Sequence, residues 1–280
     1  MKYFFIRFFH AFYNEPKNKF FTTMSKYKDK WYEKKSDEKE IAAREVVSEL
    51  FDIINPASVI DVGCGDGSWL SVIMEMEGSS ISEYVGVDGK WVSDRILKIP
   101  ESNFKATDLK DEIKIERTFD LVISLEVAEH LPGHEAERFV EKLVSLGPIV
   151  LFSAAVPFQG GTNHKNEKWQ HYWANLFSRH GYKAVKTIRK KIWNNKNIYD
   201  FYRQNMMLYV EKEKIKHLDI SSSDIVANNN LISVIHPDLF ERKMSKYSGI
   251  KEFDPRYISV RKLMKSIPRI FSYSIKSMFS

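Results

Sequence analysis

Three glycines at alternate positions follow a short apolar segment near residue 60. The segment 59–62 contains one acid, Asp61, and Gly63, Gly65 and Gly67 come directly after it. A buried parallel strand that runs into a glycine turn and then a helix N-terminus forms the ligand crevice of open α/β sheets. Glycine suits this turn because the backbone needs dihedral angles closed to other residues and must lie against the ligand. The pattern therefore predicts a crevice for a nucleoside-containing ligand.

The spacing of these glycines separates two classes of cofactor. It is Gly-x-Gly-x-Gly, whereas the dinucleotide fingerprint is Gly-x-Gly-x-x-Gly. In the fingerprint the third glycine lets helix and strand pack closely beside the pyrophosphate. Here the third glycine is displaced, so the spacing argues against a nicotinamide-dependent oxidoreductase.

Two further acids and an apolar segment follow in order along the chain. Asp88 lies 25 residues beyond Gly63, after a predicted second strand, and Asp108 follows a predicted third strand. The segment 119–131, FDLVISLEVAEHL, contains a fourth strand. Together with the glycine turn, these features resemble the class I S-adenosylmethionine-dependent methyltransferases over residues 55–155.

The resemblance implies roles toward S-adenosylmethionine. The glycines would let the backbone lie under its methionine and ribose portions. Asp88 would accept hydrogen bonds from the ribose hydroxyls, as acids after the second strand do in nucleoside-binding sheets. Asp108, beside the Leu109 backbone, would accept from the adenine amine, and Ser124 and Leu125 would face the methionine end. The implied cofactor-binding residues are Asp61, Gly63, Gly65, Gly67, Asp88, Asp108, Leu109, Ser124 and Leu125.

The assignment of Asp61 to the cofactor site has an electrostatic argument, and the assignments of Asp88 and Asp108 each have an alternative interpretation. Under the resemblance, Asp61 lies near the sulfonium-bearing half of the cofactor, where an acid is electrostatically favourable. From the residues alone, Asp88 is also explained as a turn residue before Gly89, and Asp108 as a helix cap.

Two histidines are candidate general bases. Methyl transfer is an in-line displacement at carbon, so the enzyme supplies alignment and a competent nucleophile. An alcohol acceptor needs a base near its hydroxyl, and histidine suits this role at neutral pH. His130 follows the fourth strand, and His164 lies in a loop after the fifth. The alternatives are structural packing for His130 and a well-capped loop around His164.

The loop over residues 156–173, VPFQGGTNHKNEKWQHYW, is rich in polar and aromatic side chains. Rings stack on the C–H faces of a sugar or polyol, while amide, imidazole and carboxylate groups bind hydroxyls. With the segment 201–205, FYRQN, this loop resembles methyltransferases of bacterial surface (capsular) polysaccharide gene clusters. The resemblance implies O-methylation of a sugar or sugar derivative. The predicted substrate-binding residues are Gln159, Asn163, Asn166, Glu167, Trp169, His171 and Tyr172.

The histidine spacing does not predict a metal site. His130 and His134 are four residues apart, but Pro132 intervenes and prevents a clean helical pair. A Mg²⁺ site formed by His164, His171 and Glu167 is the less favoured alternative, since oxygen-rich magnesium sites leave little trace in a sequence. S-adenosylmethionine is the cofactor that the resemblance implies.

Alternating strands and helices predict an α/β fold. It is a doubly wound, mostly parallel seven-stranded sheet, Rossmann-like as in class I methyltransferases, with helices on both faces. The last two strands form a terminal hairpin. The predicted strands are residues 59–62, 84–87, 103–106, 119–124, 149–153, 184–188 and 206–210, and the predicted helices are residues 37–54, 68–77, 135–146 and 168–180.

The methyltransferase domain is predicted at residues 37–212, between an N-terminal extension (1–36) and a C-terminal appendage (213–280). The stretch 260–279 has apolar residues along one helical stripe and basic residues elsewhere. Docking of this stripe on the main domain or on a second subunit, giving a homo-oligomer, is the favoured interpretation. Peripheral contact with an anionic membrane surface is the alternative.

Composition limits the remaining classes. The single cysteine excludes an internal disulfide framework, and no apolar run reaches the roughly 20 residues of a membrane span. We therefore expect a cytoplasmic protein, or one peripheral at the inner face of the membrane. The net charge is +6, with no acid among residues 183–196, which suggests either an anionic partner or a solvated face.

Nucleic acid is not favoured as the acceptor. Enzymes of this fold that methylate DNA amino groups carry a Pro-Pro-aromatic tetrapeptide after the fourth strand, and residues 124–127 are Ser-Leu-Glu-Val. The favoured partner is a small molecule or glycan. The alternatives are a methyltransferase acting on another small molecule or on nucleic acid, and a catalytically inactive S-adenosylmethionine-binding protein.

Overall fold

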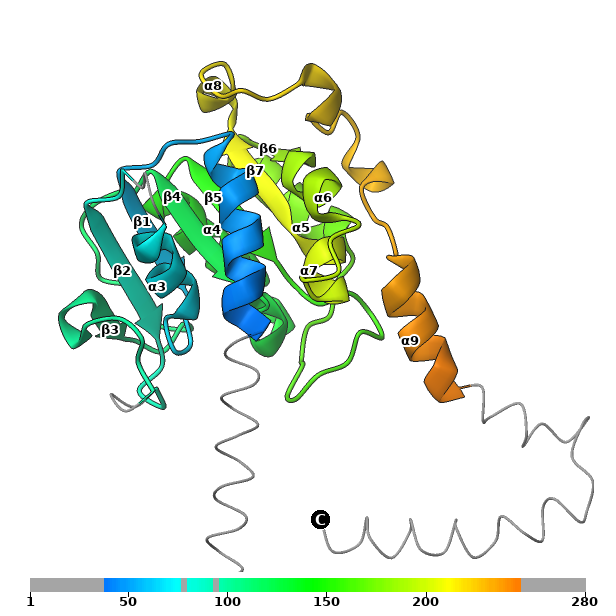
Figure 1. Cartoon of the computed structure of the whole chain (residues 1–280), viewed down its shortest axis with the longest axis horizontal. Coiled ribbons are helices and arrows are strands. Elements are labelled where there is room, and N and C mark those ends of the chain that lie inside the picture. The colour runs from blue at the N-terminus through cyan, green and yellow to red at the C-terminus, as the bar shows by residue number, and fades with distance from the viewer. Residues whose placement is uncertain (1–37, 77–79, 93–95, 248–280) are drawn as a thin grey trace, which may run out of the picture. The chain divides into compact units, whose positions relative to one another are not determined.

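The computed structural model describes residues 38–76, 80–92 and 96–247. Among these residues, seven strands form one sheet in the order β3-β2-β1-β4-β5-β7-β6 (Figure 1). The strands are β1 (Ser58–Val62), β2 (Glu83–Asp88), β3 (Phe104–Ala106), β4 (Leu121–Leu125), β5 (Ile149–Ser153), β6 (Tyr182–Val185) and β7 (Met207–Glu211).

The sheet is parallel except at one edge. Strands β3, β2, β1, β4 and β5 pair in parallel, while β7 pairs antiparallel with both β5 and β6. The predicted fold class, a doubly wound and mostly parallel seven-stranded sheet, is confirmed, and so is the terminal hairpin.

Helices lie on both faces of the sheet (Figure 1). A helix over residues 38–51, drawn in blue, packs with α3, α6 and α7 against one face, while α4 and α5 pack against the other. The α-helices with defined bounds are α3 (Ser68–Glu75), α4 (Ala136–Leu146), α5 (Gln170–Arg179), α6 (Thr187–Ile192), α7 (Asp200–Asn205), α8 (Lys212–Ile215) and α9 (Pro237–Tyr247). The 3₁₀ turns are η1 (Glu101–Asn103), η2 (Ala128–His130), η3 (Gly133–Glu135), η4 (Ser222–Asp224) and η5 (Asn229–Leu231).

The two faces of the sheet bury two separate apolar clusters. Successive side chains of a strand point to opposite faces, so neighbouring residues enter different clusters. Val59 packs in the cluster that contains α3, whereas Ile60 packs in the cluster that contains α4 and α5. Strands buried on both faces are mostly apolar along their whole length, as β1, β4 and β5 are.

The region between β6 and β7 differs from the prediction. The predicted strand 184–188 is wrong beyond Val185, because Thr187 begins α6. Asp224 stabilises this start: its backbone oxygen accepts from Lys186 N at 3.0 Å, and its carboxylate accepts from Thr187 Oγ1 at 2.9 Å and Lys190 Nζ at 2.6 Å. These contacts are remote in sequence, so local β propensity did not reveal them.

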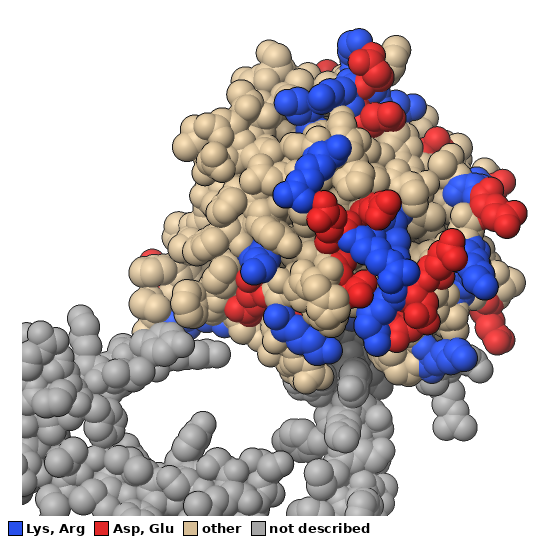
Figure 2. Space-filling view, turned by 180° about the vertical axis from the view of Figure 1, so that it is seen from behind, with Lys and Arg blue, Asp and Glu red and all other residues tan. Residues whose placement is uncertain are grey.

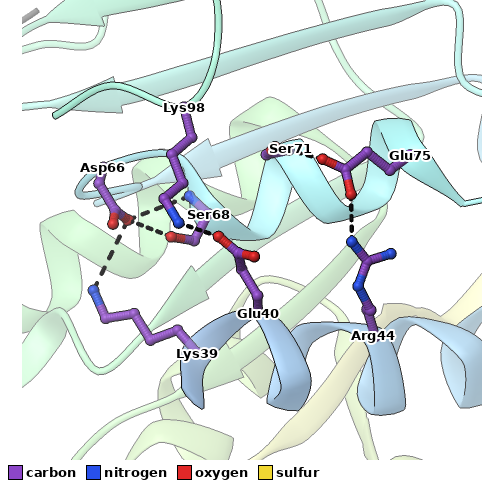
Figure 3. A network of polar contacts seen from close by, with 8 residues as sticks. All are labelled: Lys39, Glu40, Arg44, Asp66, Ser68, Ser71, Glu75 and Lys98. Atoms are coloured by element: carbon purple, nitrogen blue, oxygen red, sulfur yellow. Dashed lines mark hydrogen bonds and ion pairs between the residues drawn. The ribbon is translucent and has the colours of Figure 1, made fainter. Parts of the chain in front are cut away.

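A polar network joins the helix over residues 38–51 to α3 and to the glycine turn (Figure 3). Lys39 Nζ lies 3.9 Å from Asp66 Oδ1, and the same oxygen accepts from Ser68 Oγ at 2.7 Å. Arg44 forms an ion pair with Glu75 of α3. These contacts are partly exposed, so we assign them to orientation of the two helices rather than to large stabilisation.

The described residues divide into two units, with the boundary between Ser233 and Val234. The predicted boundary after residue 212 stays a prediction. Of the two predicted extensions, residues 1–36 and the amphipathic stripe at 260–279 lie outside the described residues. No helix among the described residues combines the length and apolar character needed to span a membrane.

Asp120 joins the starts of two central strands. Its Oδ2 accepts hydrogen bonds from Ala57 N at 2.9 Å, Ser58 N at 3.0 Å and Ser58 Oγ at 3.1 Å. We expect Asp120→Ala to lower the free energy of unfolding by about 1–3 kcal/mol, because partly buried donors lose their acceptor. Urea denaturation measures this change, with Asp219→Ala at an exposed position as the matched control. Equal midpoints for the two variants would contradict the assignment.

Candidate active site

A cleft of about 1320 Å³ lies at the carboxyl ends of β1, β2 and β4. Pockets for one small ligand are usually about 300–1,000 Å³, so this cleft has room for a cofactor and an acceptor together. Predicted site residues that line it are Asp61, Gly63, Gly65, Asp88, Asp108, Leu109, Leu125, His130 and Asn163.

The glycine turn brings bare backbone to the cleft. Gly63 has φ 88°, and a Cβ at this position would lie 2.3 Å from Val127 Cγ2, so neither its conformation nor its surroundings admit a side chain. Gly65 has φ 58° and open space where its Cβ would be. Gly67 is the N-cap residue of α3 and does not line the cleft. A flat ligand can therefore lie directly against the Gly65 backbone.

Asp88 connects the end of β2 to the glycine turn. Its Oδ2 accepts from Gly65 N at 2.8 Å, and its Oδ1 accepts from Gly89 N at 2.6 Å. Burial raises the pKa of this carboxyl, while the two backbone donors act in the opposite direction. Each oxygen keeps lone-pair capacity toward the cleft, as binding of ribose hydroxyls requires.

Trp91 is a cleft residue that the sequence reasoning missed. Its side chain is 68% exposed, lines the cleft and interacts with Asp88. An exposed indole beside the acid that is predicted to bind ribose offers a flat apolar surface for a nucleoside. The available signal was an aromatic residue three positions after the acid. On the other side, Asp108 is exposed and forms an ion pair with Lys110 at 3.1 Å.

Asp61 and Ser124 are both buried, and only Asp61 lines the cleft. Burial, and then the nearby Asp88 and Asp66 carboxylates, raise the pKa of Asp61 to about 8, whereas Lys39 lowers it. Ser124 is buried, and its Oγ donates to Val62 O at 2.9 Å. Ser124 therefore ties β4 to β1 and is not part of the cleft lining, while Leu125 after it is.

The two candidate bases lie side by side, and His130 lines the cleft whereas His164 does not. The rings of His130 and His164 meet edge to face with centroids 4.9 Å apart, and Glu129 completes a cluster of possible ligand atoms within 4.8 Å. Lys165 N and Asn166 N donate to Glu129 O at 2.7 and 3.0 Å, which fixes the loop of His164 beside η2. Burial lowers the pKa of His130, with the neighbouring His164 adding to the effect.

Two carboxyls at this rim were missed in the sequence. Burial, and then the nearby Glu126 carboxyl, raise the pKa of Glu129 to about 9. Glu126 has φ 56°, an unusual conformation for a residue with a side chain, and its carboxyl accepts from Gln159 Nε2 at 2.8 Å and Asn205 Nδ2 at 3.2 Å. The available signal was the spacing Glu-x-x-Glu-His directly after an apolar strand.

Of the seven predicted substrate-binding residues, one lines the cleft and six do not. Asn163 lines the cleft, together with Thr162 and Lys165 of the same loop. Gln159 is buried against Glu126, and Glu167 contacts His164. The remaining predicted residues, which do not line the cleft, are Asn166, Trp169, His171 and Tyr172.

The alternative Mg²⁺ set is not assembled as predicted. His171 Nδ1 lies 2.9 Å from Ser233 Oγ, on the α5 side, whereas Glu167 Oε1 lies 2.9 Å from His164 Nδ1. Glu167 therefore contacts His164 without His171, and Glu129 and His130 also lie beside His164.

Comparison with known proteins identifies the family. A family model described as "Methyltransferase domain" matches residues 35–190, more than half of the chain. No curated protein sequence matches significantly.

Solved structures with detectable similarity include the small RNA methyltransferase HEN1 (17% identity, TM-score 0.42), covering 65% of this chain and 25% of that one. An O-methyltransferase family protein from Burkholderia thailandensis has 14% identity and TM-score 0.43, covering 56% and 51%. Magnesium protoporphyrin IX methyltransferase from Synechocystis PCC 6803, with bound SAM, has 16% identity and TM-score 0.41, covering 63% and 80%. The match thus covers about a quarter of the length of HEN1 and about half of the length of the Burkholderia thailandensis protein.

Asp88→Ala should weaken S-adenosylmethionine binding by about 10- to 100-fold, because two charge-assisted hydrogen bonds to ribose and the support of the glycine turn are lost together. Titration calorimetry measures this change. The control is Glu116→Ala, an exposed acid outside the cleft lining. Unchanged affinity in Asp88→Ala would contradict the assignment.

Asp61 predicts a pH dependence of binding. With a pKa of about 8, this carboxyl holds its proton below that pH and becomes an anion above it. The sulfonium of S-adenosylmethionine favours the anion, so its affinity relative to the uncharged thioether S-adenosylhomocysteine should rise between about pH 6 and pH 9. In Asp61→Asn the ratio of the two affinities should lose this rise. A pH-independent ratio in the unaltered protein would refute the prediction.

Proposed function

We propose that this chain, which belongs to the methyltransferase domain family, uses S-adenosylmethionine as its methyl donor and that its acceptor is a hydroxyl oxygen of a sugar or sugar derivative. The biological setting that we propose is synthesis of a bacterial surface polysaccharide. The observation that carries the choice of an oxygen acceptor is the cluster of Glu129, His130 and His164, in which His130 lines the cofactor cleft.

The cluster supplies what an alcohol acceptor needs. S-adenosylmethionine brings an activated methyl carbon, but an alcohol is a weak nucleophile until its proton is removed. His130 lines the cleft, and its lowered pKa keeps the imidazole neutral near pH 7, able to accept a proton. Amine acceptors do not need such a base once they are neutral, so the cluster favours oxygen.

The proposed reaction is a single in-line displacement. The acceptor oxygen forms a bond to the methyl carbon as the bond from that carbon to sulfur breaks. The electron pair of the breaking bond stays on sulfur and gives neutral S-adenosylhomocysteine. The hydroxyl proton passes to the neutral imidazole of His130. The protein aligns the two reactants between the glycine turn and the rim and removes that proton.

Two segments support a sugar acceptor. Residues 156–173 and 201–205 carry the resemblance to surface polysaccharide methyltransferases, and they meet through side chains in this structure. Asn205 Nδ2 donates to Gln159 Oε1 at 2.8 Å, and both residues contact Glu126. The same loop brings Thr162, Asn163 and Lys165 to the cleft, a set of polar groups suited to hydroxyl-rich ligands.

The charge distribution gives no support to a nucleic-acid acceptor. The basic segment 183–196 is partly neutralised by acids: Lys190 pairs with Asp224 at 2.6 Å, and Lys191 pairs with Glu49 at 2.5 Å. Figure 2 shows acidic and basic side chains interspersed over the face that it presents. Binding to a phosphate backbone ordinarily requires a continuous basic surface.

Activity on a panel of acceptors tests the proposal. The panel contains mono- and oligosaccharides, a peptide, a small phenol and RNA, and formation of S-adenosylhomocysteine is measured. Turnover should occur with saccharides, and His130→Ala should lower kcat by about 10²- to 10⁴-fold while the affinity for S-adenosylhomocysteine is kept.

His180→Asn, at an exposed residue after α5, is the matched control and should keep full activity. Turnover with RNA or peptide but with no saccharide would refute the proposed acceptor. An unchanged kcat in His130→Ala would refute the role of the cluster.

A further inference from the structure

The cluster of Glu129, His130 and His164 has the composition of a metal site. Each residue offers one ligand atom, and these atoms all lie within 4.8 Å of one another. Ligands at about 2.0–2.2 Å from one ion lie up to about 4.4 Å apart, so small side-chain rotations bring the three around a common centre. We propose that Glu129, His130 and His164 bind a divalent metal ion that holds the acceptor hydroxyl.

Glu129 is the group that points to a cation. Its side chain is completely buried, and neither carboxylate oxygen has a hydrogen-bond donor. Burying a carboxylate without a partner is costly, and buried charges in proteins are normally paired or coordinate metals. An ion in the cluster would supply the partner that both oxygens lack.

The carboxylate of Glu126, next to that of Glu129, adds a second negative group that a cation would stabilise. The Glu126 carboxyl is a close neighbour of the Glu129 carboxyl. Within the described part of the chain, neither carboxyl forms an ion pair with Lys or Arg. Two neighbouring carboxylates repel each other in a buried site, and a bound divalent ion would relieve that repulsion.

His164 is held as metal-binding histidines are. Its Nδ1 lies 2.9 Å from Glu167 Oε1, and the Glu167 carboxylate accepts from Phe158 N at 2.8 Å and Gly160 N at 2.6 Å. A carboxylate on one ring nitrogen fixes the tautomer and leaves the other nitrogen free to coordinate. Gly161 packs against the ring, since a Cβ there would lie 2.1 Å from His164 Nε2.

The site is open on the side where the acceptor would enter. His130 is exposed and lines the cleft, so an ion held by three protein groups keeps positions for one or two acceptor oxygens. Adjacent hydroxyls of a sugar could occupy two such positions. Carboxylate ligands suit Mg²⁺ and Mn²⁺, and imidazole suits transition metals, so Mn²⁺ matches the mixed set.

A bound ion changes how the hydroxyl loses its proton. This step rests on the proposed function. Coordination to a divalent ion lowers the pKa of a bound oxygen, so the proton can leave to solvent at the exposed rim. The resulting alkoxide oxygen forms the bond to the methyl carbon, and the electron pair of the broken bond stays on sulfur. In this refinement of the proposed function, His130 and His164 act as ligands, and solvent takes the proton that the metal-free mechanism assigns to His130.

Titration of metal-free protein with Mn²⁺, followed by the electron paramagnetic resonance signal of free Mn²⁺, tests the site without any acceptor. The unaltered protein should bind a single ion. Glu129→Gln and His164→Asn should each weaken binding by more than about tenfold, and Glu167→Gln, which acts through His164, by about 10- to 100-fold.

The control is His134→Asn, at an exposed histidine four residues after His130, which should bind Mn²⁺ like the unaltered protein. Titration with S-adenosylhomocysteine checks that each variant is folded, because cofactor binding does not need the metal ligands. Absence of Mn²⁺ binding by the unaltered protein, or equal binding by the three variants, would overturn the proposal.

The two proposals fail in different ways. Saccharide methylation that persists in protein shown to bind no Mn²⁺ or Mg²⁺ overturns the metal site and leaves the acceptor intact. The metal site is supported and the acceptor is refuted if the unaltered protein binds one Mn²⁺, Glu129→Gln loses this binding, and no saccharide is methylated.

Discussion

The parallel pairing of β1 between β2 and β4 is the constraint on which the site depends. Asp61 stands opposite Gly86 on one side and Ile123 on the other, so the three strands end at the same edge of the sheet. The glycine turn, Asp88 at the end of β2, and the segment that contains Glu126 and His130 all lie at this edge. An antiparallel neighbour would carry its following residues to the opposite edge.

Backbone conformations at this edge are unusual, and they occur where the site is assembled. Besides the glycines, the described residues with positive φ are Glu126, Phe158 and Asn163. Glu126 follows β4, and the other two belong to the loop that carries His164. Such conformations cost free energy and persist only where surrounding contacts compensate for them. Here the compensation comes from Gln159 and Asn205 around Glu126, and from Glu167 under the loop.

Buried carboxyls in and beside the cleft favour ligands that carry positive charge. Asp61 near the glycine turn and Glu129 at the rim both have raised pKa values, mainly because they are buried. Burial stores unfavourable free energy in an unpaired carboxylate, and a cationic ligand releases it. The methyl donor carries a sulfonium, and the proposed metal is a dication. One arrangement of acids thus serves both halves of the cleft, with specificity for each ligand left to the surrounding shape.

The sequence by itself determined the cofactor half of this protein. Gly63, Asp88 and the strands beside them are local features: each strand is an apolar run, and each functional residue follows the end of its strand. Tertiary structure decided the rim. Glu129 and His164 are separated by 34 intervening residues, and they meet because Lys165 N and Asn166 N donate to Glu129 O. The helix at Thr187 depends on Asp224 in the same way. Periodicity reports how a segment is buried, whereas contacts between distant loops follow from hydrogen bonds that no local pattern encodes.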